Sequence, residues 1–521
     1  MNLLRWMLDR HEQEVLELHD YLILHEGEKL LLKTVIEELG WSRYRVVTAF
    51  NSLIDDLNLV DQHAVSEEKF IYDTKYIEVK KQNQAAVLEL EHYYRQNSVI
   101  WWFLVDSLME DVTSYENFAV KHNTSVSVIR SSKERATEAL SKHGIKITKN
   151  NHLVGDEATL RTFFVHIMNQ YHSYTEMPLD EFENDEIEDI VDIVVDIFDI
   201  ENRQSLRQSL RIQVMIAIIR IRKGHYLRDV DMPKIVRPSD EWPPDQKIRY
   251  QKYRALFQET FDLPEHVIHT EVVFSILSLF VSGIIRDAPR GVLTDKMRKH
   301  FTEDRERFVH RFEQFFGKEL PDEYQYRLSL ALAGPNMRQA YFENTYDRKR
   351  HSMQFLEENF PIQSRFIDCV MADFKRERLS WTPNADRKVE NLSQEYFNAM
   401  VAIVPADMIL PKIHIALDFL YFPGLETVLR RIFESQWQIN FVFNEIEDPD
   451  FYISDMELDT FENTKALVWT TFPDASTLGQ FIKEAMALSE RKFLEQRNVD
   501  NWEELTLNWR RKKLNSYYIN I

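Results

Sequence analysis

Cysteine and glycine are scarce in this 521-residue chain, which has one cysteine and 11 glycines. The single thiol, Cys369, excludes disulfides within the chain and metal clusters of several thiolates, and it fits a reducing compartment. The few glycines disfavour a glycine-rich α/β enzyme and favour a mostly helical protein. The chain has no Gly-rich phosphate loop and no G-x-S-x-G or H-E-x-x-H motif. We therefore expect no catalytic residues, no cofactor and no metal.

Long uncharged apolar runs are also absent. The first residues, 1–5, lack a signal pattern, and the apolar stretch 203–222 is interrupted by arginines, which predicts a buried core helix. Positive charge is in deficit, with 64 Lys and Arg against 85 Asp and Glu and a formal net charge of −21. This deficit argues against non-specific binding of nucleic acid over the whole surface. We expect a cytoplasmic protein that does not bind membranes.

The chain is too long for a single hydrophobic core, and its length predicts three to five domains. Its hydrophobic content of 44% and aromatic content of 12% predict well-filled interiors and exclude a disordered protein.

Residues 115–171 are the most informative stretch, because their pattern predicts a winged helix-turn-helix. A short helix over 115–122 is followed by a turn at 123–125, where Ser125 or Ser127 caps the next helix, predicted over 126–142. Gly144 ends that helix in the left-handed conformation. Residues 145–148 and 152–154 alternate like the strands of a hairpin, the wing, and a further helix is predicted over 158–172.

This stretch is basic within an acidic chain, with seven cations and two acidic residues between positions 121 and 149. Phosphate neutralisation is the main sequence-independent source of DNA affinity, so the pattern favours DNA binding over a solvated helix that happens to carry lysines. The predicted DNA contacts are Ser125, Ser127, Arg130, Ser131, Lys133 and Arg135 in the helix, and Lys146, Lys149, Asn150 and Asn151 in the wing.

A second helix-turn-helix is predicted over residues 29–57, inside a domain of residues 1–80. An amphipathic helix over 13–27 precedes it, Gly40 forms its turn, and residues 70–79 alternate like a wing. Ile36 stands where the motif usually has a small residue, and Asp55 and Asp56 would repel phosphate. The alternative is therefore a structural or dimerising role. The predicted DNA contacts are Ser42, Arg43, Tyr44, Arg45, Thr48 and Asn51.

The remaining domains are predicted from composition and periodicity. The winged domain occupies residues 81–172 and begins with a helix over 86–110. A first helical domain covers 173–290, with helices at 180–199, 203–222, 246–260 and 269–280, and a second one of five helices covers 291–404. Residues 405–500 form a small α/β domain, with strands at 412–419, 438–444 and 465–471 and helices at 424–435 and 477–490. The tail, 501–521, carries a basic run at 510–513 that is either solvated or in contact with DNA.

The order of these parts resembles the Mga/AtxA group, virulence regulators of Gram-positive bacteria that carry phosphotransferase-system regulation domains (PRDs). The most telling local match is the wing followed by L-x-G-x-E at 153–157 and R-x-F-F at 161–164. The resemblance implies a transcriptional regulator, usually an activator, that binds promoter DNA. It also implies two PRD-like domains phosphorylated on histidine by the sugar phosphotransferase system, and a dimerising C-terminal domain similar to the IIB component of that system.

The chain departs from the family pattern at the histidines and at the IIB-like loop. The helices at 204–223 and 384–402 contain no histidine, which leaves His225, His269, His310 and His351. His269 is the best candidate phosphohistidine, and a partly buried or capping histidine is the alternative. Its pairing with His266 as a metal site is attributed to chance spacing. The loop at 420–424 lacks a cysteine, which predicts that the C-terminal domain transfers no phosphate.

The sequence thus predicts a mostly helical regulator that binds double-stranded promoter DNA, and the resemblance implies that it is a homodimer and contacts a phosphocarrier of the sugar system. The alternatives are an RNA-binding antiterminator linked to the phosphotransferase system, and a phosphocarrier of that system. Antiterminators of this kind carry a small β-sheet RNA domain at the N-terminus, against which the helix-turn-helix pattern argues.

Overall fold

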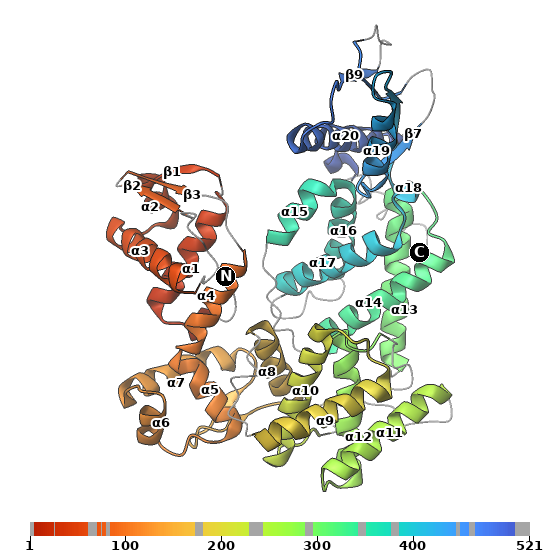
Figure 1. Cartoon of the computed structure of the whole chain (residues 1–521). Coiled ribbons are helices and arrows are strands. Elements are labelled where there is room, and N and C mark those ends of the chain that lie inside the picture. Colours follow the sequence, from red (N-terminus) through yellow and green to blue (C-terminus); the bar gives the residue numbers. More distant parts are fainter. Residues whose placement is uncertain are drawn as a thin grey trace, which may run out of the picture. The chain divides into compact units, whose positions relative to one another are not determined.

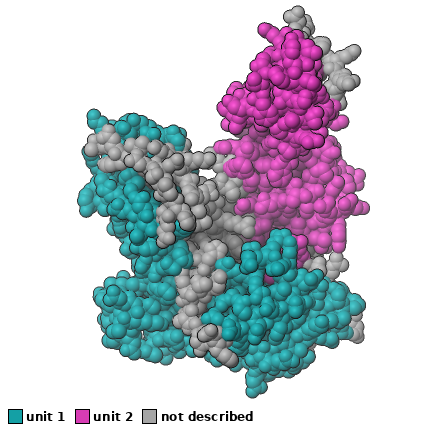
Figure 2. Space-filling model, viewed as in Figure 1, with its two compact units in different colours: residues 1–279, 342–347 teal, residues 280–341, 348–521 magenta. Residues whose placement is uncertain are grey.

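The computed structural model describes residues 5–25, 27–60, 70–73, 75–79, 84–171, 181–228, 243–286, 295–341, 351–376, 385–443, 449–457 and 464–505. The protein is mainly helical, with a small parallel sheet near its C-terminus (Figure 1). This confirms the predicted fold class. Its contacts divide the chain into two compact units, residues 1–279 with 342–347 and residues 280–341 with 348–521 (Figure 2). The finer division into five domains and a tail stays a prediction.

The first unit begins with a winged helix. Its elements are the short helix η1 (Arg5–Met7), α1 (Arg10–Ile23), β1 (Lys29–Leu31), α2 (Leu32–Leu39), α3 (Arg43–Val60), β2 (Phe70–Asp73) and β3 (Tyr76–Val79). The strands form an antiparallel sheet in the order β1-β3-β2, so the predicted wing is confirmed. Gly40 ends α2 at a φ of 64°. The helix-turn-helix predicted over 29–57 begins at α2, because residues 29–31 form β1: Leu30 pairs with Ile77 in the sheet and both side chains enter the core.

The second helix-turn-helix follows. Its elements are α4 (Gln84–Gln96), α5 (Val99–Met109), α6 (Tyr115–Lys121), α7 (Val126–Ser141), β4 (Lys146–Ile147), β5 (Leu153–Val154) and α8 (Glu157–Tyr171). The predicted helices at the turn, the hairpin and the helix after it are all present. The single helix predicted over 86–110 is two helices, because Ser98 caps α5 by accepting a hydrogen bond from the Trp101 N–H.

Among the described residues, four helices complete the first unit, and the fourth extends a few residues into the second unit. They are α9 (Glu181–Phe198), α10 (Gln204–Arg222), α11 (Pro244–Thr260) and α12 (Glu265–Val281). The arginine-interrupted segment is the predicted core helix, since Leu210, Met215 and Ile216 of α10 are fully buried. Arg211 on α10 pairs with Glu188 on α9 at 2.6 Å, so part of the acidic face of α9 is neutralised within the unit. Among the described residues, no helix has the length and apolar character needed to cross a bilayer.

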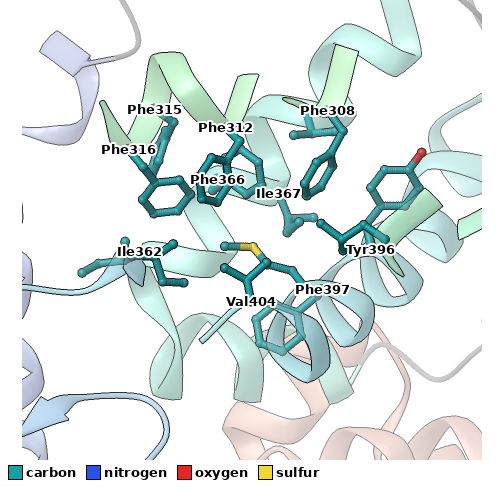
Figure 3. Packing of buried hydrophobic residues seen from close by; sticks show 14 of the residues in the cluster. Phe308, Phe312, Phe315, Phe316, Ile362, Phe366, Ile367, Tyr396, Phe397 and Val404 are labelled. Atoms are coloured by element: carbon teal, nitrogen blue, oxygen red, sulfur yellow. The ribbon is translucent and has the colours of Figure 1, made fainter. Parts of the chain in front are cut away.

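Within its described residues, the second unit contains the five helices expected over 291–404. They are α13 (Asp295–Phe316), α14 (Asp322–Tyr341), α15 (His351–Asn359), α16 (Pro361–Phe374) and α17 (Ala385–Ile403). Phe308, Phe312 and Phe315 recur at helical spacing on α13 and pack their rings against Phe366 of α16 (Figure 3). Cys369 lies beside this core, and burial raises the pKa of its thiol to about 11, so the thiol stays protonated at neutral pH.

A small parallel sheet with flanking helices follows in the second unit. Its elements are α18 (Ala406–Ile409), β6 (Lys412–Asp418), α19 (Pro423–Glu434), β7 (Asn440–Phe443), β8 (Phe451–Ser454), β9 (Lys465–Val468) and α20 (Ala475–Gln496). The sheet is wholly parallel, in the order β7-β6-β8-β9. The predicted strands and helices are present, but β8 was not predicted. It has only four residues, and its pairing with β6 and β9 defines it more than its side-chain pattern does.

Candidate nucleic-acid interface

Helix α7 owes its position to local signals that the sequence contains. Ser125 is its N-cap, and the Ser125 hydroxyl accepts a hydrogen bond from the Val128 N–H at 3.3 Å. Asn123 in the preceding turn has a φ of 46°, and Gly144 after the helix has a φ of 71°. Ile129 packs with Phe103 and Phe118 in the core under the turn. This packing fixes α7 against α5 and α6, as the recognition helix of the motif requires.

The solvent-facing side of α7 carries polar residues at a regular spacing. Ser127, Arg130, Ser131 and Glu134 are all exposed and stand at positions i, i+3, i+4 and i+7. Residues at this spacing share one helix face, and homeodomains use the same spacing for the side chains that contact bases in the major groove. We call these four residues the exposed face of α7. It includes Glu134, which the sequence prediction left out.

Some of the predicted DNA-contact residues of the wing lie at the surface, and others lie in the interior. Lys146, Lys149 and Asn150 are exposed. Asn151 is only 7% exposed and has a φ of 65°. Its side-chain oxygen accepts a hydrogen bond from Lys133 Nζ at 2.7 Å. Lys133 Nζ also donates to the Thr148 carbonyl at 3.1 Å, so Lys133 and Asn151 hold the wing against α7 and are not directed to a ligand.

Arg135 also contacts the protein itself. Its guanidinium donates to the backbone carbonyls of Trp6 at 2.8 Å and Leu8 at 2.6 Å, which fixes α7 to the start of the N-terminal domain. Lys121 likewise pairs with Asp106, at 2.9 Å. The cations of this region that remain exposed, without an ion pair to any described residue, are Arg130, Lys142, Lys146 and Lys149. The positive charge offered to a ligand is therefore smaller than the sequence alone indicates.

Comparison with known proteins bears on this region. Residues 83–167 match the family model of the Mga helix-turn-helix domain. The chain carries an Mga helix-turn-helix domain. The match covers α4 to α7, the wing and most of α8, and it confirms the predicted resemblance to Mga-like regulators. No curated protein shows a significant match to the chain. The Mga domain belongs to a DNA-binding type, so the exposed face of α7 and the wing are its candidate DNA surface.

The N-terminal winged helix lies outside the Mga match. Some of its predicted DNA-contact residues are exposed, and others bind the protein itself. Ser42 accepts a hydrogen bond from the Arg45 N–H at 3.2 Å, so it caps α3. Arg45 pairs with Glu14 at 2.9 Å and stacks over the Trp41 ring. The others stay at or near the surface: Arg43, Tyr44 and Asn51 are exposed and Thr48 is half-buried. Tyr44, at 81% exposed, is the most exposed large hydrophobic side chain of α3.

An ionic network that the sequence analysis did not foresee connects the Mga domain to the helical part of the first unit. Arg161 on α8 donates to Glu157 at 3.0 Å and to both oxygens of Glu271 on α12, at 2.6 and 3.0 Å. Arg220 on α10 donates to Glu157 at 2.8 Å and to the Leu153 carbonyl of the wing at 3.4 Å. All four charged side chains are buried. Glu157 and Arg161 belong to the motif that predicted the family, and besides each other they bind Arg220 and Glu271, which lie more than 60 residues away.

Histidines adjoin this network. His225 Nε2 lies 2.7 Å from Glu110 at the end of α5, and His152 of the wing lies 3.5 Å from the same carboxylate. Burial disfavours the Glu110 carboxylate, but the hydrogen bond from His225 and the nearby His152 hold its pKa below the ordinary value.

The other candidate phosphohistidines lie elsewhere. His269 on α12 is half-buried, with Nδ1 2.7 Å from the Tyr250 hydroxyl. His310 bonds Gln314 at 2.8 Å. The side chain of His351 and the basic run 510–513 lie outside the described residues.

The loop after β6 holds a carboxylate from the protein itself. The backbone N–H groups of Leu420, Tyr421 and Phe422 donate to the Asp455 side chain at 2.7 to 3.1 Å, just before α19 begins. N–H groups at a helix N-terminus are a ready anion site, and Asp455, 6% exposed, occupies this one. The missing cysteine at 420–424 was the sequence feature that indicated a loop without phosphate transfer. The sequence did not indicate that Asp455 binds this loop, because Asp455 directly follows β8, a strand that was not predicted.

Proposed function

We propose that this protein is a transcriptional regulator of the Mga type, usually an activator in that family, and that it binds promoter DNA through α7 and its wing. The exposed face of α7 enters the major groove, with Arg130 donating to a guanine and Ser127 and Ser131 contacting bases or phosphates. Lys146, Lys149 and Asn150 hold the phosphate backbone. The observation that carries this proposal is the exposed i, i+3, i+4, i+7 face of α7 beside an exposed basic wing, inside the Mga match.

The N-terminal winged helix extends this surface through Arg43, Tyr44 and Asn51, so one protomer contacts DNA twice. We also propose that the protein acts as a cytoplasmic homodimer assembled through the C-terminal domain. The edge strand β9 supports this assembly, because its Lys465, Ala466 and Val468 are exposed.

A link to the sugar phosphotransferase system belongs to the same proposal. His269 lies two residues before Glu271, which binds Arg161 of the Mga domain. His269 itself contacts Tyr250 of α11, so a phosphoryl group at His269 would add negative charge at the contact between α12 and α11 and would bias the position of α12.

The alternative functions have less support. An antiterminator of the same system would begin with a small β-sheet RNA domain, whereas residues 10–60 of this chain form mainly helices. A IIB-like phosphocarrier needs a free anion site after its first strand, and Asp455 already occupies the N–H groups there. These observations favour the DNA-binding regulator.

The test is a binding titration of the full-length protein with duplexes enriched from the genomic DNA of its host. Arg130→Ala is expected to weaken binding by about 1–3 kcal/mol, the usual value of one base contact. Lys146→Ala and Lys149→Ala are each expected to reduce the slope of log K against log salt by about 1. Arg491→Ala, an exposed arginine on α20, is the matched control for charge. Unchanged affinity and unchanged slope in all three variants would contradict the proposal.

A further inference from the structure

The candidate DNA surface includes an acidic residue. Glu134 is exposed and occupies the i+7 position of the exposed face of α7, after Ser127, Arg130 and Ser131. A carboxylate there faces the same groove as Arg130 and repels phosphate, so it lowers the affinity for every duplex regardless of sequence.

Within the described residues, no ion pair offsets the repulsion between this carboxylate and phosphate. Glu134 forms no ion pair with any residue that the structure describes, although Arg130 is four residues before it. Glu138 lies one turn after Glu134 on the same side, and both are exposed. Like charges at i and i+4 destabilise a helix by about 0.2–0.5 kcal/mol. Glu134 is therefore mildly unfavourable both for the helix and for non-specific DNA binding.

The hydrogen-bonding groups of the DNA bases indicate a role for the Glu134 carboxylate. An ionised carboxylate only accepts hydrogen bonds. In the major groove, guanine presents two acceptors and thymine an acceptor and a methyl group, so neither base donates to a carboxylate. Adenine has its N6 donor next to the N7 acceptor, which would repel the second carboxylate oxygen. Cytosine presents the N4 amine alone, which makes it the best partner.

We propose that Glu134 determines specificity by accepting a hydrogen bond from N4 of a cytosine in the site that α7 contacts. This inference rests on the proposed DNA-binding function. The favourable hydrogen bond at cytosine offsets the phosphate repulsion at the correct site only, so the carboxylate increases discrimination more than affinity.

The experiment selects bound duplexes from a random pool with the full-length protein and with the variants Glu134→Ala, Glu134→Gln and Glu138→Ala. Wild type is expected to prefer cytosine at one position by at least about fivefold, the lower end of the effect of one good base contact. Glu134→Ala should lose this preference and bind unrelated duplexes more tightly. Glu134→Gln should shift it to adenine, whose N6 and N7 a glutamine amide matches. Glu138→Ala, which removes the same charge one turn away, should keep the cytosine.

Two results would overturn the inference and leave DNA binding intact. One is a base preference that is the same in wild type and Glu134→Ala at every position. The other is a wild-type preference for adenine at the position that depends on Glu134. If the wild-type protein enriches no duplex at all, the proposed function fails together with the inference. All three variants change exposed side chains, and their circular dichroism should match that of the wild type.

Discussion

Lys133→Ala should loosen the wing without removing a DNA contact. The variant deletes hydrogen bonds from Nζ to the Thr148 carbonyl at 3.1 Å and to Asn151 Oδ1 at 2.7 Å. Hydrogen bonds from a charged donor contribute about 1.5–3 kcal/mol each, and partial solvent access at Lys133 reduces this value. Among the described residues, Asn151 Oδ1 then keeps only the hydrogen bond from the Tyr115 hydroxyl, at 3.4 Å. We expect a loss of about 2 kcal/mol in the local stability of the hairpin.

Native-state amide hydrogen exchange of the full-length protein measures this loss directly, because opening of the hairpin need not unfold the rest of the chain. A change of about 2 kcal/mol corresponds to roughly 30-fold faster exchange in peptides covering residues 145–154. Lys142→Ala, which changes an exposed lysine after α7, is the matched control and should leave exchange unchanged.

Comparison with Arg130→Ala distinguishes the loss of a DNA contact from the loosening of the wing. Arg130→Ala should weaken DNA binding with the exchange of the hairpin unchanged, whereas Lys133→Ala should accelerate exchange and weaken DNA binding only by misplacing Lys146 and Lys149. If Lys133→Ala exchanges within twofold of wild type, the two hydrogen bonds do not hold the wing and Lys133 returns to the set of candidate DNA contacts.

Two further predictions concern stability. Glu271→Gln removes the carboxylate that binds buried Arg161, and it should destabilise the first unit by about 3–5 kcal/mol, seen as a lower urea midpoint of its transition; a loss under 1 kcal/mol would contradict the role given to the network. Burial and the neighbouring Asp9 and Asp56 raise the pKa of Glu12 to about 7, although its hydrogen bond from the Asp9 N–H opposes the shift. The folded state then binds a proton that the unfolded state releases near pH 4.5, so stability should fall as pH rises from about 5 to 7. Glu12→Gln should flatten this part of the curve of melting temperature against pH, and the exposed Glu17→Gln should not.

The sequence alone was sufficient for features set by neighbouring residues. The left-handed Gly144 and the hairpin that follows depend on contacts within a few positions, so their residue types predict their geometry. The sequence also predicted a serine cap for α7, at Ser125 or Ser127, and the structure places it at Ser125. The apolar segment 203–222 likewise predicted a buried core helix, and α10 is buried along most of its length. The same local signals carried the family resemblance, because the matched motif is almost continuous in the chain.

Only the tertiary structure decided which polar residues are available to a ligand. Arg130 and Lys133 are three residues apart on one basic helix, yet Arg130 is exposed and Lys133 holds the wing. Arg135 contacts backbone carbonyls 127 and 129 residues away, and Arg161 contacts a carboxylate 110 residues away. A long cationic side chain reaches whichever acceptor the folded chain brings to it. Its role is thus set by packing between distant segments, which no local pattern records.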